Sequence, residues 1–251
     1  MSNLSLTYLG HTSILVATEC TQLLFDPNLS RHVLCVKRLD DPYLNLDMLR
    51  SLSAIVISNA HHNRFDRTSF KYFPQSISIV VPKGLSSILS KFFHYPIKEV
   101  DVGESCQIGD ITLTAEKALH RGFRLSGLRH TCALNYVISH ENQKVLYTSD
   151  TRYEGSYFYE LGKKYHFDAA ILPIDHVTPS FLAGKRYLKP AQAAQALLDL
   201  NVQTLIPYAY GSFLLGKRDP QKSLKALQEQ AKHLEMADRV KILAVGQKTL
   251  L

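Results

Sequence analysis

The chain has 251 residues, long enough for one large α/β domain with a sizeable core. Apolar residues make up 45% and charged residues 20%, the balance of an ordinary globular protein, which excludes a disordered or low-complexity chain. The 29 Lys and Arg against 22 Asp and Glu give a net charge of +7, which favours acidic partners. The basic residues are spread over the whole length, so most of them are expected on a solvated surface.

Apolar runs and helical patterns alternate along the chain. After an N-terminal hairpin, strands are predicted at 54–57, 77–81, 111–114, 134–138, 145–147 and 169–172. Helices are predicted at 85–93, 157–164, 191–200 and 221–234, with Asp219 as the N-cap of the last and Pro220 at its first position. This order is typical of two mixed sheets between layers of helices. We see no repeat or linker, so we predict one domain over 1–251.

The loop after the strand at 54–57 carries the most informative motif. Two-zinc hydrolases commonly place His-x-His-x-Asp-His on such a loop, because imidazole and carboxylate suit a borderline metal. Here Ser58 ends the strand, and the four ligand positions hold Asn59, His61, Asn63 and Arg64. Only His61 matches the motif. The loop therefore indicates a metallohydrolase ancestry with most of the ligands replaced.

Other segments in the same order extend this resemblance over most of the chain. They are Tyr8-Leu9-Gly10-His11-Thr12-Ser13 with Leu24-Phe25-Asp26-Pro27, Lys117-Ala118-Leu119-His120, Leu146 to Thr151, Ala170 to Ile174, Leu188-Lys189-Pro190, and Ile206 to Phe213. Together they resemble the metallo-β-lactamase superfamily. The branch that they resemble most includes N-acyl-phosphatidylethanolamine phospholipase D and L-ascorbate-6-phosphate lactonase. The resemblance implies an α/β fold, the four-layer αββα sandwich of the metallo-β-lactamase type.

The resemblance also assigns ligand positions to two metals. The first metal would use Asn59, a weak ligand, with His61 and His120, and Asp150 would bridge to the second. The second would use Asn63, Arg64 and Ala209 besides Asp150. An amide is a poor zinc ligand, a methyl group is none, and a guanidinium does not deprotonate to become one. We therefore expect the second metal site to be empty.

Arg64 has a different expected role. A cation beside Asp150 would neutralise the carboxylate that the missing metal once balanced, so we predict a partly buried ion pair between Arg64 and Asp150. The alternative is that the long Arg64 side chain turns outward to solvent.

His61, His120 and Asp150 have a suitable composition for a single site for one divalent metal, Zn, Mn or Fe. The alternative is that the histidines are only hydrogen-bonded in place, and we expect no metal in the native state. If the protein is catalytic, Asp150, His120 and Arg64 are the residues expected to act. His176, on a later loop, could be a replacement ligand, although lining the pocket is the simpler role.

Basic residues near the expected site favour a small anionic ligand. Arg121, Arg124 and Arg129 are predicted in a loop at the site mouth, with His130 beside them. Lys185 and Arg186 belong to another loop, and His176 and Tyr210 are further substrate-binding candidates. Arg is well shaped to bind phosphate or carboxylate oxygens, although unrelated surface charges would give the same pattern. Nucleic acid is disfavoured, because no recognisable binding module is present. The oligomeric state is left open.

No apolar run approaches the roughly 20 residues needed to span a bilayer. The chain enters a strand-like alternation at Leu4 without a basic and apolar leader, so a cytoplasmic protein is expected. Four scattered cysteines predict reduced thiols.

Two functions from different classes follow. The first is a hydrolase-like protein with at most one metal, acting on a small anionic ester, lactone or phosphodiester. The second is a non-catalytic relative that binds a ligand or a partner protein in the former active-site pocket.

Overall fold

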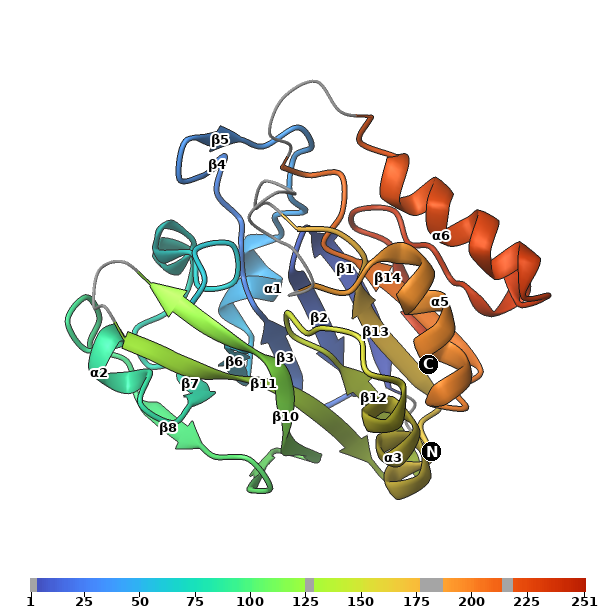
Figure 1. The fold of residues 1–251 in the computed structure, drawn as a ribbon. Coiled ribbons are helices and arrows are strands. Elements are labelled where there is room, and N and C mark those ends of the chain that lie inside the picture. Colours follow the sequence, from blue (N-terminus) through green and yellow to red (C-terminus); the bar gives the residue numbers. More distant parts are fainter. Residues whose placement is uncertain (1–3, 125–128, 177–186, 214–218) are drawn as a thin grey trace.

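The computed structural model describes residues 4–124, 129–176, 187–213 and 219–251, with the backbone alone for 121–131 within them. Two sheets face each other at its centre (Figure 1). The first contains, in spatial order, β15 (Lys248–Leu250), β1 (Ser5–Gly10), β2 (Ser13–Ala17), β3 (Gln22–Phe25), β6 (Ala54–Val56), β7 (Ser78–Pro82) and β8 (Ile97–Val100). The second contains β14 (Thr204–Tyr208), β13 (Ala169–Pro173), β12 (Gln143–Tyr147), β11 (Arg129–His140), β10 (Ile111–Arg124) and β9 (Ser105–Ile108).

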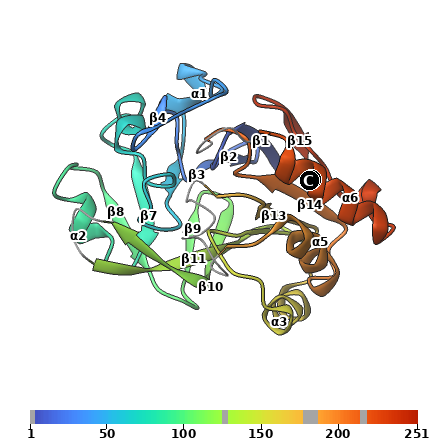
Figure 2. The same cartoon turned by 45° about the horizontal axis from the view of Figure 1, so that its top comes forward.

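Helices cover the outer face of each sheet, as Figures 1 and 2 show. The second sheet is covered by α3 (Gly155–Tyr165), α5 (Pro190–Asp199) and α6 (Lys222–His233). The first is covered by shorter elements, α1 (Leu46–Arg50), the 3-10 helix η1 (Arg67–Tyr72) and α2 (Ser86–Leu89). A separate hairpin, β4 (His32–Val33) with β5 (Val36–Lys37), projects at the top of Figure 1. A 3-10 turn, η3 (Ala237–Arg239), follows α6. The predicted αββα sandwich is confirmed.

Apolar side chains form three layers, one between the two sheets and one on the outer face of each sheet. Successive side chains of a strand point to opposite faces. In β6, Ala54 and Val56 therefore join the layer between the sheets, whereas Ile55 packs against the outer helices. In β12, Tyr147 faces the inner layer and Leu146 faces α3 and α5. Strands buried on both faces need apolar residues at every position.

The parallel strands of both sheets have their carboxyl ends at the same edge of the sandwich. β3, β6 and β7 are parallel in one sheet, and β12, β13 and β14 are parallel in the other. Ser58, just after β6, and Ser149, just after β12, lie across from each other, with the Ser149 Oγ donating to the Ser58 Oγ at 2.8 Å. The loops that follow these strands therefore converge at one edge of the sandwich.

Three details differ from the sequence prediction. The predicted helix at 85–93 is shorter, since only α2 (Ser86–Leu89) is helical, and beyond it the Phe93 ring stacks on Phe70 with ring centroids 4.7 Å apart. The last helix begins at Lys222, two residues after Pro220, its predicted first position, because the Asp219 carboxylate caps a turn by accepting from the Gln221 N–H at 2.9 Å. Pro220 lies in that turn rather than in the helix.

The third difference concerns the basic residues. Arg121 and Arg124 belong to the long strand β10 and Arg129 begins β11, so these residues lie in a paired hairpin and not in a loop. The pairing register of β10 with β11 shifts between Lys117 and Arg121, and regular pairing resumes beyond this irregularity. Lys185 and Arg186 lie outside the described residues.

Within the described ranges, no helix has both the length and the apolar character needed to cross a bilayer.

A close approach between α3 and α5 gives a test of the outer layer. A Cβ at Gly162 would lie 2.3 Å from the Leu200 carbonyl oxygen, a backbone atom that moves only if the helix moves. We expect Gly162→Ala to destabilise the protein by roughly 1–3 kcal/mol despite the better helix propensity of alanine. Urea unfolding measures this loss. Lys163→Ala, at an exposed position of the same helix, should change little, and a stabilised G162A protein would contradict the close packing.

Candidate functional site

The loop after β6 starts with a buried serine held by a carboxylate. Ser58 donates to Asp26, at the end of β3, from its backbone N–H at 2.7 Å and from its hydroxyl. Both residues are fully buried. Burial raises the pKa of Asp26, and the nearby Arg64 charge and the Ser58 hydrogen bonds oppose that rise. A buried carboxylate here calls for a cation.

Arg64 is that cation, and its side chain has no solvent exposure. Its Nη1 lies 2.8 Å from the Asp26 Oδ2 and donates to the phenol oxygens of Tyr208 at 2.6 Å and Tyr147 at 3.2 Å. Its Nη2 donates to the Asp150 Oδ1 at 2.7 Å. Burial alone lowers the pKa of Arg64, but Asp150, the two phenols and Asp26 outweigh it and raise that pKa well above its usual value. The guanidinium is therefore charged, and it joins the two sheets.

Asp150 links Arg64 to the histidines. Its Oδ2 is 2.8 Å from the His61 Nδ1 and accepts from the Asn59 amide at 3.2 Å. Burial tends to raise the pKa of Asp150, but Arg64 and then His61 outweigh this and hold it well below its usual value. Asp150 is an anion shared by three neighbours.

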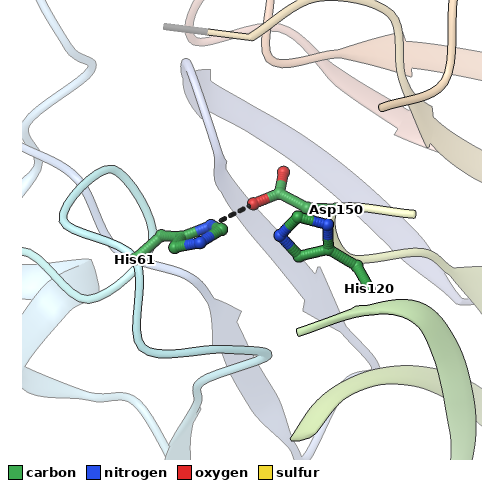
Figure 3. Close-up of side chains that lie close together, drawn as sticks. All are labelled: His61, His120 and Asp150. Carbon is green, nitrogen blue, oxygen red and sulfur yellow. Dashed lines mark hydrogen bonds and ion pairs between the residues drawn. The ribbon is translucent and has the colours of Figure 1, made fainter. Parts of the chain in front are cut away.

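His120, on β10, completes a group of three metal-ligating side chains (Figure 3). Its ring lies edge-on to that of His61, with centroids 4.9 Å apart. One ligand atom from each of His61, His120 and Asp150 can be chosen so that all lie within 4.8 Å of one another. Nitrogen and oxygen ligands on one tetrahedral zinc lie about 3.3–3.6 Å apart. A small side-chain adjustment would bring the three atoms to that spacing.

An aromatic wall continues from His120. The Tyr187 ring lies 5.1 Å from the His120 ring, and the His176 ring stacks on Tyr187 at 4.8 Å. His176 is thus separated from the three-residue group by Tyr187. It does not belong to the three-residue group, and its lining of the site stays a prediction.

The comparisons with known proteins identify the family. The profile of the Beta-lactamase superfamily domain matches residues 21–209, most of the chain. The chain belongs to the metallo-β-lactamase superfamily.

Characterised and uncharacterised members of the superfamily resemble the chain at low identity. The N-acyl-phosphatidylethanolamine-hydrolyzing phospholipase D 1 of Caenorhabditis elegans is 25% identical over 93% of this chain and 72% of its own length. The mitochondrial enzyme of that name from Saccharomyces cerevisiae is 21% identical over 89% of this chain and 51% of its own length. An uncharacterised Mycobacterium tuberculosis protein, 26% identical, is matched over 85% of this chain and 60% of its own length. The chain thus spans only part of these relatives.

Solved structures support the superfamily fold. A possible metal-dependent hydrolase from Veillonella parvula has a TM-score of 0.81 at 14% identity, over 99% of this chain and all of that one. An isothiocyanate hydrolase from Delia radicum gut bacteria has a TM-score of 0.78 at 16% identity, over 98% of this chain and 99% of that one. At these identities the likeness establishes the fold alone.

The structure brings Asn59, His61 and Arg64 of this loop into contact with Asp150 or with one another. The predicted Arg64 to Asp150 ion pair is confirmed, and the outward-facing alternative for Arg64 is wrong. Arg64 is more deeply buried than predicted, at 0% exposure. Asn59 uses its amide oxygen to accept from the His61 N–H at 2.8 Å and its amide nitrogen to donate to the Ser149 Oγ. Its oxygen is therefore already engaged.

Asn63 and Ala209, which the resemblance assigns to ligand positions, form hydrogen bonds through their backbones. The Asn63 carbonyl accepts from the Thr12 hydroxyl at 2.7 Å and from the Asn28 amide at 3.0 Å. Ala209 has a left-handed φ of 59° and donates from its N–H to the His11 carbonyl at 3.0 Å. Tyr210 is partly buried and packs against the second sheet's helical layer, and burial raises its pKa.

The sequence did not predict the contacts of Arg64 with Asp26 and with two tyrosines, Tyr147 and Tyr208. Asp26 and Tyr208 enter the sequence-based prediction only through segments that resemble the family, and Tyr147 only as the end of the predicted strand at 145–147. The available signal was a carboxylate directly after the apolar run at 23–25, which is costly to bury unless a cation pairs with it. The tyrosines gave no signal, because their rings pack in the apolar inner layer while only their hydroxyls reach Arg64.

The Arg64 contacts generate a stability prediction. Arg64→Met should cost roughly 3–5 kcal/mol of unfolding free energy, because it leaves two buried carboxylates without their cation. Adding Asp26→Asn should recover part of this loss, and urea denaturation of the four proteins in the cycle measures the coupling. Arg152→Met is the control, since its side chain is 56% exposed and its ion pair with Glu154 lies on the surface. A loss below about 1 kcal/mol for R64M would contradict the assigned role.

Proposed function

We propose that this protein is a hydrolase-like member of its superfamily in which Arg64 takes the place and the charge of the second metal. At most one divalent metal, Zn, Mn or Fe, would bind, at His61, His120 and Asp150. The substrate class is a small anionic ester, lactone or phosphodiester. The observation that carries the proposal is the fully buried Arg64 guanidinium, 2.7 Å from the Asp150 Oδ1.

The residues at the second position do not fit a metal. Arg64 already balances Asp150 there, and a second cation next to a buried guanidinium would be repelled. Ala209 offers only a methyl group, and Asn63 only a neutral amide. A two-metal hydrolase places a metal ion at this position. Here the positive charge belongs to the Arg64 side chain, which cannot dissociate from the protein.

The residues at the first position fit one metal by type and proximity. Two imidazoles and one carboxylate, with one position left open, form a known kind of catalytic zinc site. His61 keeps 16% of its side chain exposed, so the group is accessible from the surface. A metal held there would act as a Lewis acid and lower the pKa of a bound water.

The side chains around this group have distinct tasks in the proposed reaction. Asp150 orients His61 through the 2.8 Å contact with its Nδ1. Arg64 keeps Asp150 anionic and fixed, and so acts as a positioning residue, while Asn59 holds the His61 backbone. The aromatic wall of Tyr187 and His176 would flank a bound substrate. Arg121, Arg124, Arg129 and Tyr210 are kept as proposed contacts for its anionic group.

A specific observation favours the second candidate, a non-catalytic relative that binds a ligand or partner in this pocket. The Asp150 carboxylate has hydrogen-bonding contacts with Arg64, His61 and Asn59 at the same time. Both oxygens of the Asp150 carboxylate therefore already have partners within the protein, so the carboxylate does not need a metal to be satisfied.

Metal content separates the two candidates. Protein purified without chelator and incubated with excess Zn²⁺ or Mn²⁺ should hold no more than one ion per chain by elemental analysis. His61→Ala and His120→Ala should each abolish that binding, whereas His176→Ala, the matched neighbouring histidine, should retain it. No metal under any condition would reject the single-metal hydrolase and favour the binding protein. Two ions per chain would contradict the role of Arg64.

Restoring the replaced ligands tests the alignment itself. The variant Asn59→His, Asn63→Asp, Arg64→His and Ala209→His should bind a second ion, because all ligand positions of the superfamily are then filled. The matched control keeps Arg64 and changes only the other three residues. It should bind no second ion, since the guanidinium remains beside Asp150. Equal metal content in the two variants would show that Arg64 does not exclude the metal.

A further inference from the structure

A second cavity lies away from the three-residue group. Its volume is about 570 Å³, within the range of small-molecule sites, and it lies between the loop after β3 and the 3-10 helix η1. None of its described lining residues belongs to the His61, His120 and Asp150 group or contacts Arg64. Nothing in the proposed hydrolytic chemistry uses this cavity.

Three hydrogen bonds hold the segments of the cavity wall, each through at least one backbone atom. The Leu29 N–H donates to the Ser69 Oγ at 2.7 Å, which ties the loop to η1. The Arg38 N–H donates to the Arg31 carbonyl at 2.8 Å, and the Ser30 hydroxyl donates to the His32 carbonyl at 2.8 Å. These bonds close the base of the β4 and β5 hairpin beside the cavity. The cavity is thus formed by ordered backbone.

The lining has an apolar side. Leu29, almost fully buried, connects the cavity floor to the outer apolar layer of the first sheet. Leu44, 43% exposed, and Tyr72 add apolar surface.

The rim of the cavity is cationic. The described lining residues include three basic side chains, Arg31, Lys71 and His32, and one carboxylate, Asp41. Among the described residues, the Arg31 side chain has neither an ion-pair nor a hydrogen-bond partner. Lys71 lies over the Tyr72 ring with its Nζ 5.0 Å from the centroid, at the border between the charged and apolar parts. An unengaged guanidinium beside apolar surface suits an anionic group that carries an apolar body.

We propose that this cavity binds a small amphiphile with an anionic headgroup, with the head between Arg31 and Lys71 and the apolar body against Leu29, Leu44 and Tyr72. The site is independent of any metal at His61. A carboxylate or a phosphate monoester supplies the same headgroup chemistry, and Arg31 can donate to two oxygens of either.

The probes are octyl phosphate and octanoate at concentrations where both are monomeric, measured by isothermal titration calorimetry. Inorganic phosphate lacks the apolar body and octanol lacks the charge, so both should bind at least roughly tenfold more weakly. The stronger of the two anionic probes identifies the headgroup. Octanol binding as tightly as both anionic probes would overturn the proposal, and so would no binding of either anion.

Two variants that change the charge of the lining in opposite directions should change the binding affinity in opposite directions. Arg31→Gln should weaken binding about tenfold, the effect of losing one charge-assisted hydrogen bond. Asp41→Asn should strengthen it, because it removes the only acid among the described lining residues. Arg50→Gln removes an exposed positive charge outside the cavity and should change nothing. An equal loss in R50Q and R31Q would assign the affinity to overall charge and overturn the site.

A matched leucine pair tests the apolar contact. Leu44→Ser should weaken octyl phosphate binding, whereas Leu46→Ser, 45% exposed but outside the lining, should not. Both positions are exposed, so the fold should persist, which circular dichroism checks. Binding to anionic lipid vesicles without binding to monomeric probes would replace the cavity with a membrane surface and overturn the proposal. Chelator should leave probe binding unchanged, so failure here and failure of metal binding at His61 are separate results.

Discussion

The site depends on one buried charge arrangement, a guanidinium between two carboxylates at the edge where the two sheets meet. Asp26 follows a strand of the first sheet and Asp150 follows a strand of the second, and Arg64 contacts both. A buried carboxylate without a cation would cost several kcal/mol, roughly as much as a large part of the stability of a typical domain. The sheets can therefore keep this spacing only while a cation lies between them. In a two-metal relative an ion would serve that need, and here a side chain does.

This arrangement has a consequence for the chemistry that can take place. A guanidinium offers its positive charge only through N–H donors, and at least three of its hydrogen bonds already go to Asp26, Tyr208 and Asp150. It cannot bind or activate a water as a metal does. Any catalysis would therefore use the more exposed side of the site, where His61 and His120 lie. Arg64 would contribute by holding Asp150 in position from the buried side.

Sequence patterns were sufficient for the fold because they follow from burial. The strand at 54–57, apolar at every position, could only lie between two covered faces, and the structure places Ala54 and Ile55 on opposite layers. Sequence also predicted the Arg64 to Asp150 contact, because the family resemblance places Arg64 beside Asp150 and that carboxylate needs a cation. It could not predict the contacts with Tyr147 and Tyr208, since their hydroxyl positions depend on how the sheets pack. The shortened helix at 86–89 was equally out of reach, because the ring stacking of Phe93 on Phe70 joins distant segments.

The backbone around the site carries strain that burial alone does not require. His11, Asp26 and Ala209 all have left-handed φ values, 50°, 42° and 59°, and each directly follows a strand. Such conformations cost on the order of 1–3 kcal/mol each for residues other than glycine, and they persist only where the surroundings fix them. At 209 the hydrogen bond to the His11 carbonyl fixes the chain, although the side chain is only a methyl group. The hydrogen bonds around Arg64 and Asp150 therefore hold the chain at the ends of three strands in a backbone conformation that residues other than glycine rarely adopt.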